Sequence, residues 1–302
     1  MAAYVLEWEQ SAPIDCCRGS VAIGNFDGAH RGHAELIGNL TRGPRPAVVV
    51  TFDPHPLLLL RPEVAPPLLT TPPERAAVLQ RLGADHVITL RTTFDLLGLS
   101  ARDFFQGLIV ERLGAQRVVE GPNFRFGKNR EGDTILLGEL SRDEGILFDV
   151  VALQQIDGVE VSSSFIRACL ATGQIAEANA ALGRRYTLCG VVETGDRRGR
   201  LLGFPTANLG NVQTVVPSEG VYAARTLGRP TAVNIGPNPT FGQQNSRIEA
   251  HVIGYDGDLY GQSMTLEFVS RLRDTRRFGS VDELREQLRR DVAQTIEAVS
   301  HD

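Results

Sequence analysis

Two histidines, His30 and His33, lie three residues apart in a glycine-rich segment, Gly24–His33, which reads Gly-Asn-Phe-Asp-Gly-Ala-His-Arg-Gly-His. An apolar run, Ser20–Ile23, precedes this segment, and a helix-compatible run, Ala34–Ile37, follows it. A strand, a glycine-rich turn and a helix in this order direct backbone N–H groups at one point, which suits an anion and most often a phosphate. The imidazole rings add side-chain donors, so we expect a nucleotide site whose chemistry occurs at the triphosphate.

Two further segments of the first half carry groups that bind phosphate well. Gly121–Lys128 follows an apolar run and brings two cations, Arg125 and Lys128, beside a glycine-containing loop. Ser162–Arg167 offers three hydroxyls at a helix start, with the guanidinium of Arg167 one turn into the helix. Hydroxyl donors and a guanidinium together make a phosphate cradle. Taken alone, the histidine motif could be surface histidines on a turn, and Ser162–Ser164 could be an ordinary helix cap.

The densest pattern of the second half is Gly195–Asn208, where glycines and arginines lead into Pro-Thr-Ala-Asn. The Thr206 hydroxyl and the Asn208 amide oxygen are hard donors of the kind that Mg²⁺ accepts beside phosphate oxygens. Glu249 lies in a mostly apolar strand-like run, where it either faces solvent or serves as a general base for attack on a γ-phosphate. Spacing alone does not decide between a site and a polar hairpin.

The elements that must position these groups differ between the halves. In the first half, strand-like and helical runs alternate, which predicts a parallel sheet with helices on both faces and a ligand beyond the carboxyl ends of the strands. The expected strands are 20–23, 47–51, 86–90, 117–120 and 148–153, and the expected helices are 71–82, 100–112 and 134–140. His30, Asp53 and Asn123 each follow a predicted strand, so three loops could converge.

After a helical segment at 162–182, glycine and proline separate short strand-like runs, which predicts a small antiparallel barrel or sandwich. The runs are 188–193, 221–226, 231–235, 248–253 and 264–269. A final helix begins at the N-cap Ser280, with Glu283 completing a capping box. We expect its apolar stripe to pack on the barrel: Val281, Leu284, Leu288, Val292, Ile296 and Val299. The domain boundary is predicted between residues 185 and 186.

Composition excludes several classes of protein. The formal net charge of -5 over 302 residues argues against nucleic acid as the main partner, since such proteins usually have a basic surface. The four cysteines include no Cys-x-x-Cys pair, so neither a zinc site nor a thioredoxin-type site is expected. No apolar run reaches the ~20 residues of a membrane span. The N-terminus lacks a basic signal-peptide region, and we expect a cytoplasmic protein.

These motifs resemble the prokaryotic bifunctional riboflavin kinase/FMN adenylyltransferase (FAD synthetase) family. In the first half, the matching segments are Gly24–His33, Thr51–Pro56, Asn123–Gly127 and Ser162–Arg167. The resemblance implies that His30 and His33 bind ATP phosphates while Ser163, Ser164 and Arg167 clamp the triphosphate from the far side. The other expected nucleotide-binding residues are Gly24, Asn25, Phe26, Asp27, Gly28, Gly32 and Asn123. Three positions depart from the family: many members carry Asp at Asn123, Thr at Ser164 and Glu at Asp53.

The second half resembles the riboflavin kinase module of the same family. The matching segments are Gly195–Asn208, Pro217–Tyr222, Asn234–Gly236, Pro239–Gly242, Glu249–His251 and Tyr255–Gly261. The resemblance implies that Thr206 binds Mg²⁺, that Asn208 supports the metal–phosphate cluster, and that Glu249 is the base for the riboflavin 5′-hydroxyl. Arg271-Leu272-Arg273 would border the flavin from the last loop before the helix, where Thr275 replaces a common acidic residue. Gly195, Arg200, Gly203 and Pro205 complete the expected binding residues.

The matches cover about residues 20 to 290 in family order. They imply a Rossmann-like nucleotidyltransferase domain, 1–185, followed by a six-stranded β-barrel with a C-terminal helix, 186–302. The implied barrel reaction is phosphorylation of riboflavin to FMN, and the implied first-domain reaction is transfer of AMP from ATP to FMN, giving FAD and pyrophosphate. Two alternatives stay open: a chain that kept one activity, or a non-catalytic flavin-binding or regulatory protein.

Overall fold

A computed structural model describes residues 1–152, 154–156, 158–194, 199, 202–237 and 246–301. The chain divides into two compact units, Met1–Ser162 and Ser163–Asp302. This division lies before the predicted boundary at residue 185, because α7 (Ser163–Thr172) and α8 (Ile175–Leu182) group with the barrel. The last turn of α7 contacts the 211–219 segment of the same unit, since Ser218 N–H donates to Leu170 O at 2.9 Å.

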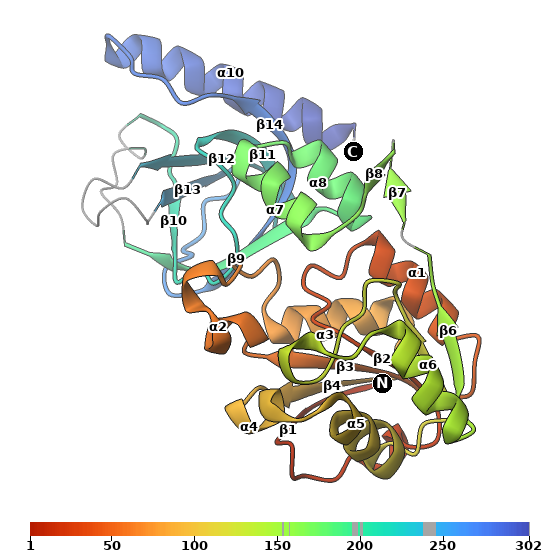
Figure 1. Ribbon diagram of the computed structural model, residues 1–302. Helices are drawn as coiled ribbons and strands as arrows, with labels where there is room; N and C mark the ends of the chain where they lie inside the picture. Colours follow the sequence, from red (N-terminus) through yellow and green to blue (C-terminus); the bar gives the residue numbers. More distant parts are fainter. Residues whose placement is uncertain (153, 157, 195–198, 200–201, 238–245, 302) are drawn as a thin grey trace. The chain divides into compact units, whose positions relative to one another are not determined.

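The first unit is built on a six-stranded parallel sheet, which confirms the predicted architecture (Figure 1). The strands are β1 (Ala2–Leu6), β2 (Ser20–Ile23), β3 (Ala47–Asp53), β4 (His86–Arg91), β5 (Arg117–Glu120) and β6 (Leu147–Val150), in the spatial order β1-β4-β3-β2-β5-β6. All five pairings are parallel. The edge strand β1 was not predicted, and the other five strands were.

Alternation along the strands sends side chains into two cores, one on each face of the sheet. In β2, Val21 and Ile23 join one core while Ala22 joins the other. One core packs against α4 (Phe94–Gly98), α5 (Ala101–Phe104), the π-helical η3 (Phe105–Arg112) and α6 (Thr134–Asp143); the other packs against α1 (Arg31–Leu40) and α3 (Pro72–Arg81). The helix expected at 100–112 therefore forms as two segments. Helices on both faces agree with the prediction.

Short elements complete the first unit. They are α2 (Pro56–Leu60), the 3-10 turns η1 (Ile14–Cys16), η2 (Pro62–Val64) and η4 (Lys128–Arg130), and the hairpin of β7 (Gln155–Ile156) and β8 (Val159–Glu160). The predicted capping box of α3 is present, because Glu74 Oε2 accepts from Thr71 N–H at 2.9 Å. This box fixes where α3 begins, directly after a segment that contacts the glycine-rich turn.

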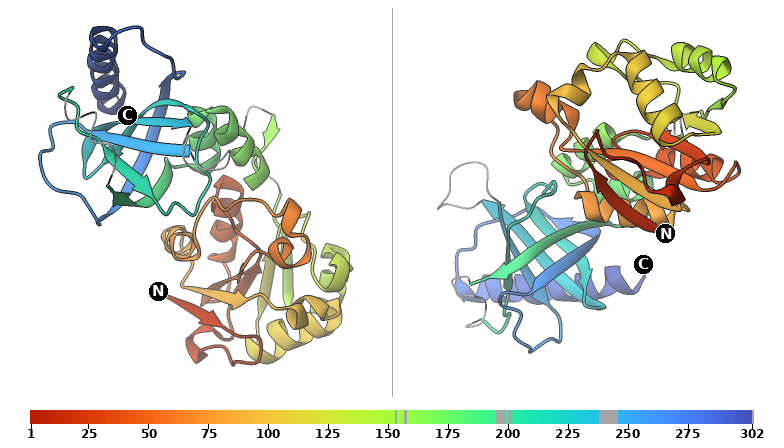
Figure 2. Two further views of the ribbon diagram at one scale, coloured as in Figure 1. Left: turned by 90° about the vertical axis from the view of Figure 1, so that its left-hand side faces the viewer. Right: turned by 90° about the horizontal axis from the view of Figure 1, so that it is seen from below.

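The second unit contains a closed antiparallel barrel, visible end-on and from the side in Figure 2. Its strands are β9 (Tyr186–Glu193), β10 (Ala207–Gly210), β11 (Gly220–Thr226), β12 (Arg229–Pro237), β13 (Ser246–Val252) and β14 (Ser263–Arg273), in the order β10-β13-β12-β11-β14-β9. The six-stranded barrel is therefore confirmed. Its interior is filled by buried side chains such as Tyr222, Leu266 and Phe268.

The C-terminal helix α10 (Val281–Ser300) begins at Ser280 as predicted, with Ser280 Oγ accepting from Glu283 N–H. The prediction of its buried face was right in part: the helix packs against β11, β12 and β14 and Val299 is buried, but polar side chains hold the other buried positions. Val281 and Ile296 are 58% and 43% exposed, and the buried side chains are Gln287, Asp291, Thr295 and Val299. Polar groups occupy this face because β14 offers them a partner: Arg273 donates to both carboxylate oxygens of Asp291, at 2.9 and 2.7 Å.

Candidate functional sites

The strand order of the parallel sheet reverses between β2 and β5, and in such sheets ligands bind beyond the carboxyl ends at this point. The glycine-rich turn follows β2, and the 121–127 loop follows β5. Glu120, at the end of β5 and only 2% exposed, accepts from Ile23 N–H at 2.6 Å and so joins the two strand ends. Sequence reasoning did not single out Glu120, although a charged residue ending an apolar strand was a visible signal.

His30 and His33 cap the first turn of α1. His30 is the N-cap, and His33, at the third helical position, accepts from His30 N–H through Nδ1 at 3.3 Å. The rings are stacked, with centroids 3.7 Å apart. Because Nδ1 of His33 accepts, a neutral His33 carries its proton on Nε2. The predicted pairing of the two imidazoles at a helix N-terminus is thus present in the structure.

The turn that precedes α1 has an unusual backbone. Phe26, Gly28 and Ala29 have φ angles of 48°, 80° and 40°. Phe26 is buried, and its ring meets the His33 ring edge-on at 5.0 Å. A Cβ at Gly32 would lie 3.2 Å from the His30 ring, so this glycine gives the imidazole room. The turn therefore shapes the surroundings of the two histidines.

Two polar residues of the turn, Asn25 and Asp27, contact other segments of the first unit. Asn25 Nδ2 lies 3.0 Å from Nε2 of His55, the N-cap of α2, and Gly24 N–H donates to Val50 O at 3.0 Å. Asp27 is buried and accepts from backbone N–H groups of Leu69 and Thr70. These contacts tie the turn to segments that follow it in the chain.

The other residues expected at the adenylyl-transfer site lie outside the glycine-rich turn, in the 121–127 loop and in α7. Asn123 is exposed, and the neighbouring Arg125 forms an ion pair with Asp133 at 3.0 Å. Ser163 and Ser164 open α7, and Arg167 lies one turn later, all in the second compact unit. Their expected action on the same triphosphate as His30 stays a prediction.

A cavity of about 440 Å³ opens against the barrel, and it contains two of the residues expected in the kinase site, Thr206 and Glu249. Much of its wall is apolar, from β11, β12, the 274–279 segment and α10. The lining includes Leu202, Phe204, Val221, Val233, Phe278, Leu284, Leu288 and Val292, with Asn234, Arg247, His251, Arg273, Arg276 and Asp291 among the polar residues. An apolar cavity with a few convergent polar groups is typical of a small-molecule site.

Glu249 is held by neighbouring strands of the barrel. Its Oε2 accepts from Asn234 Nδ2 at 3.3 Å, and its Oε1 lies 3.1 Å from Arg247 Nη2. Asn208 lies opposite Glu249 in the pairing of β10 with β13, and its Oδ1 accepts from Arg247 Nε at 3.2 Å. Arg247 therefore links the expected base to the expected metal-supporting residue, a role that the sequence did not reveal.

A second cavity, of about 470 Å³, shares Thr206 with the first. Its wall also includes Pro205, whose carbonyl oxygen lies 2.7 Å from His251 Nδ1, and the aromatic residues Tyr255 and Tyr260. The described residues contain no cluster of three or more His, Cys, Asp or Glu side chains that could hold a metal ion. The oxygens of Thr206 and Asn208 fit Mg²⁺, which needs few protein ligands when phosphates supply the others.

Arg271, expected in a loop at the flavin, instead lies in β14. Its guanidinium donates to Glu219 O at 2.8 Å and pairs with Asp274 at 2.7 Å, and of the predicted stretch 271–273 the cavity wall contains Arg273. Gly203 has a φ of 87° in the turn before β10. The expected contributions of Gly195 and Arg200 fall outside the residues that the structure describes.

Comparisons with known proteins cover both units. Residues 14–165 match the family model described as FAD synthetase, and residues 182–299 match that described as riboflavin kinase. The chain is 37% identical over 291 residues to the bifunctional riboflavin kinase/FMN adenylyltransferase of Escherichia coli K12, with 93% of this chain and 92% of that protein covered. It is 32% identical over 294 residues to the protein of the same name from Bacillus subtilis, with 93% and 92% covered.

The fold of the whole chain is also found in a solved structure. The crystal structure of a macrolide-efflux protein from Streptococcus pneumoniae superposes with a TM-score of 0.85 at 26% identity, covering 96% of this chain and 98% of the other. Among the described residues, no helix combines the length and apolar character needed to cross a membrane. With both family models matched in order, the chain belongs to the bifunctional riboflavin kinase/FMN adenylyltransferase family.

Proposed function

We propose that this chain is a bifunctional enzyme of flavin-cofactor synthesis. Its barrel phosphorylates riboflavin to FMN with ATP, and its first domain transfers AMP from ATP to FMN, which gives FAD and pyrophosphate. Relatives named for both activities align with 93% of the chain, which supports this proposal. The observation that carries it is the pair of adjoining cavities that share Thr206, one of which also contains Glu249.

In the barrel, the 440 Å³ cavity suits the apolar ring system of riboflavin, and ATP would reach Thr206 from the second cavity. We assign Glu249 as the general base. Its carboxylate takes the proton of the riboflavin 5′-hydroxyl while that oxygen attacks the γ-phosphorus and ADP leaves. Asn234 and Arg247 hold the carboxylate in one orientation, so the base is positioned before the substrate arrives.

We propose Mg²⁺ as the metal of the kinase reaction, held by the Thr206 hydroxyl and the Asn208 amide oxygen. When bound, the ion would neutralise charge on the phosphates of ATP. Arg247 Nε uses one lone pair of Asn208 Oδ1, and a carbonyl oxygen has two. Within the protein, Arg247 thus orients both the base and this oxygen.

In the first domain, a phosphate oxygen of FMN attacks the α-phosphorus of ATP, and the bond to pyrophosphate breaks. His30 and His33 lie at the N-terminus of α1, where ring and backbone N–H groups stabilise the negative charge that gathers on the leaving group. We propose Ser163, Ser164 and Arg167 as donors to the same triphosphate. Gly24, Asn25, Phe26, Gly28, Gly32 and Asn123 would shape the surface beneath the nucleotide.

We place the domain boundary between residues 185 and 186. The two family models leave residues 166–181 between them, and α7 and α8 lie in and around this gap. These helices would carry donors for the first reaction although they pack with the unit of the second.

The cytoplasm is the proposed compartment because both reactions consume ATP. The net charge of -5 favours small-molecule substrates over nucleic acid.

The proposal is tested by incubating the protein with riboflavin, ATP and Mg²⁺ and separating the flavins by chromatography. FMN and FAD should both accumulate. FMN alone would reduce the function to a riboflavin kinase, and unchanged riboflavin would favour a flavin-binding or regulatory protein.

Two variants assign the reactions to their sites. His30→Ala should stop FAD formation while FMN still forms at the wild-type rate, because the histidine belongs to the first unit. Glu249→Ala should slow FMN formation by about 10²–10⁴-fold, the usual contribution of a general base, while supplied FMN is still converted to FAD. Loss of both activities in either folded variant would contradict the two-site assignment.

A further inference from the structure

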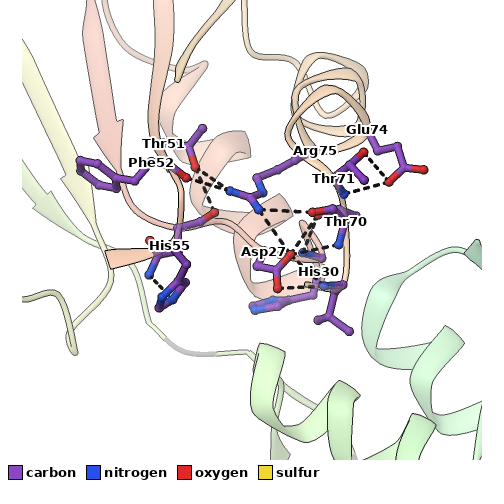
Figure 3. A network of polar contacts seen from close by, with 12 residues as sticks. Asp27, His30, Thr51, Phe52, His55, Thr70, Thr71, Glu74 and Arg75 are labelled. Carbon is purple, nitrogen blue, oxygen red and sulfur yellow. Dashed lines mark hydrogen bonds and ion pairs between the residues drawn. The ribbon is translucent and has the colours of Figure 1, made fainter. Parts of the chain in front are cut away.

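Asp27 lies in the turn between β2 and α1, and its carboxylate is directed into the protein (Figure 3). The residue is 3% exposed. Its Oδ1 accepts from Leu69 N–H at 3.1 Å, from Thr70 N–H at 3.0 Å and from the Thr70 hydroxyl at 3.1 Å, and Oδ2 lies 3.0 Å from Leu69 N. The carboxylate is therefore bound by protein donors, which differs from the direct nucleotide contact expected from the sequence.

Arg75, in the first turn of α3, is the charged partner of Asp27. It is also 3% exposed, and its Nη2 lies 3.6 Å from Asp27 Oδ1. The same guanidinium donates to Thr51 Oγ1 at 3.2 Å, Phe52 O at 3.4 Å and Thr70 O at 3.3 Å (Figure 3). One buried side chain thus joins the end of β3, the segment before α3 and the turn that leads to His30.

Two further contacts tie the same turn to these segments. Thr51 Oγ1, which accepts from Arg75, donates to Asn25 O at 3.0 Å. Thr70 Oγ1 accepts from Gly28 N–H at 3.1 Å. The turn is therefore fixed at positions 25, 27 and 28, on either side of Phe26.

The backbone between these ties needs such support. Phe26 and Ala29 have φ angles of 48° and 40°, a region that residues with a Cβ rarely adopt unless the surrounding structure holds them there. His30 follows Ala29 directly and starts α1. A change in the turn is thus transmitted to the histidine that would contact the triphosphate.

We propose that Asp27 and Arg75 are positioning residues of the adenylyl-transfer site, which hold His30 and His33 in place without touching the nucleotide. This inference rests on the proposed function of the first domain. Arginine suits the task because its planar fork of donors binds several acceptors at fixed angles, whereas a lysine ammonium is a point charge on a flexible stem. Reaction rates fall about 10²-fold for a misplacement of about 1 Å, so a loosened turn should affect catalysis strongly.

The test is Arg75→Lys in the full-length protein, which keeps the charge opposite Asp27 and removes the fork. We expect kcat for FAD formation from supplied FMN to fall about 10–100-fold, with KM for FMN changed by less than about 3-fold. A loss confined to kcat indicates that transition-state contacts are weakened while substrate binding survives. The kinase reaction of the same preparation should keep its wild-type rate, which controls for the amount of folded protein.

Thr51→Val is a second variant, chosen because it conserves shape and leaves the Asp27–Arg75 pair in place. It removes the hydroxyl that connects Arg75 to Asn25 and should lower kcat for FAD formation about 5-fold, a smaller loss than that of Arg75→Lys. The matched control is Arg45→Met, which breaks an ion pair with Asp85 at the opposite end of the sheet and should leave both reactions unchanged.

The inference is wrong if Arg75→Lys and Thr51→Val both form FAD at the wild-type rate. It is also wrong if either variant lowers the two activities equally, because the effect would then not be specific to the first domain. An unmodified protein that forms FMN but no FAD would instead refute the proposed function, so the two failures are distinguishable.

Discussion

Removing the Asp291 carboxylate should weaken the wall of the barrel cavity. Asp291, on α10, is 2% exposed, and both of its carboxylate oxygens accept hydrogen bonds from Arg273. Gln287 Nε2 also donates to this carboxylate, at 2.8 Å. Asp291 and Arg273 both line the 440 Å³ cavity, as do Leu288 and Val292 of the same helix. The ion pair therefore fastens α10 to β14 at the proposed riboflavin site.

The magnitude follows from burial. Breaking a buried pair by removing one partner costs about 3–5 kcal/mol, and the lower end applies because the Arg273 side chain is 20% exposed and can regain water. Alanine offsets about 0.5 kcal/mol through its better helix propensity. Asp291→Ala should thus lose about 2.5 kcal/mol, or about 8 °C in the Tm of the second unit.

The assay is calorimetry of the whole chain, with the barrel transition identified by loss of kinase activity after heating. The KM for riboflavin should rise while FAD formation from supplied FMN is unchanged. Glu286→Ala is the matched control, since its partner Arg290 lies one turn away on the same helix and both side chains are more than 60% exposed; it should cost less than about 0.5 kcal/mol. A Tm for Asp291→Ala within 2 °C of wild type, taken as about 0.6 kcal/mol, would refute the reasoning.

Two further changes test the first unit. Burial raises the pKa of Glu120 well above its usual value of 4.5, against the lowering effect of hydrogen bonds from Ile23 and Gly121. The folded chain therefore keeps this proton to higher pH than the unfolded chain, and stability falls as the pH rises from the unfolded value through the folded one. Glu120→Gln should raise the Tm more at pH 8 than at pH 5; equal shifts at the two pH values would contradict this. Gly127 has a φ of 75°, and Gly127→Ala would place a Cβ 2.5 Å from the backbone nitrogen of Ala101. The rate of FAD formation should therefore fall about 10-fold or more, while the rate of the kinase reaction stays unchanged. Gly121→Ala, with no atom within 4 Å of the added Cβ, is its control, and equal rates for the two variants would show that the clash is harmless.

The sequence predicted the mostly buried strands β2, β3 and β5 and also the exposed edge strand β6. β2 and β3 contain apolar runs typical of central parallel strands, whereas in β5 the run is two valines between charged residues. β1 escaped prediction because it alternates between half-buried and exposed positions at the sheet edge. β10 is four residues long and contains Asn208 and Gly210, which have low strand propensity, so it forms through pairing with β9 and β13.

The buried face of α10 could be read only in part from apolar periodicity. Of the predicted stripe, Val299 is buried, and Leu284, Leu288 and Val292 are half-buried and line the cavity, while polar side chains hold the other buried positions. Periodicity counts a carboxylate at position 291 as solvent-facing, since charged side chains are rarely buried without a partner. The partner, Arg273, is 18 residues away in the sequence, and only the tertiary fold brings it there.

The candidate sites show the same limit. Residue types and short spacings singled out His30 and His33, whereas the roles expected of Thr206 and Glu249 came from the resemblance to the family, because spacing alone left other interpretations open. The residues that hold these motifs in place lie elsewhere in the chain: Thr70 is 43 residues from Asp27, the carboxylate it binds. A contact between residues so far apart in the chain produces no periodic pattern that a single sequence could show.

Three arginines, Arg75, Arg247 and Arg273, have a common structural role. Each of them binds a carboxylate together with at least one other acceptor or a neighbouring element, and the sequence marked only Arg273, as part of a stretch expected at the flavin. A planar guanidinium can serve separate segments at once because its five N–H donors point in fixed directions. The carboxylates that these arginines bind differ in exposure, from 2% for Asp291 and 3% for Asp27 to 26% for the Glu249 side chain. This exposure leaves Glu249 accessible, as its proposed role as general base requires, whereas Asp27 is enclosed and in our proposal acts through the turn that carries His30.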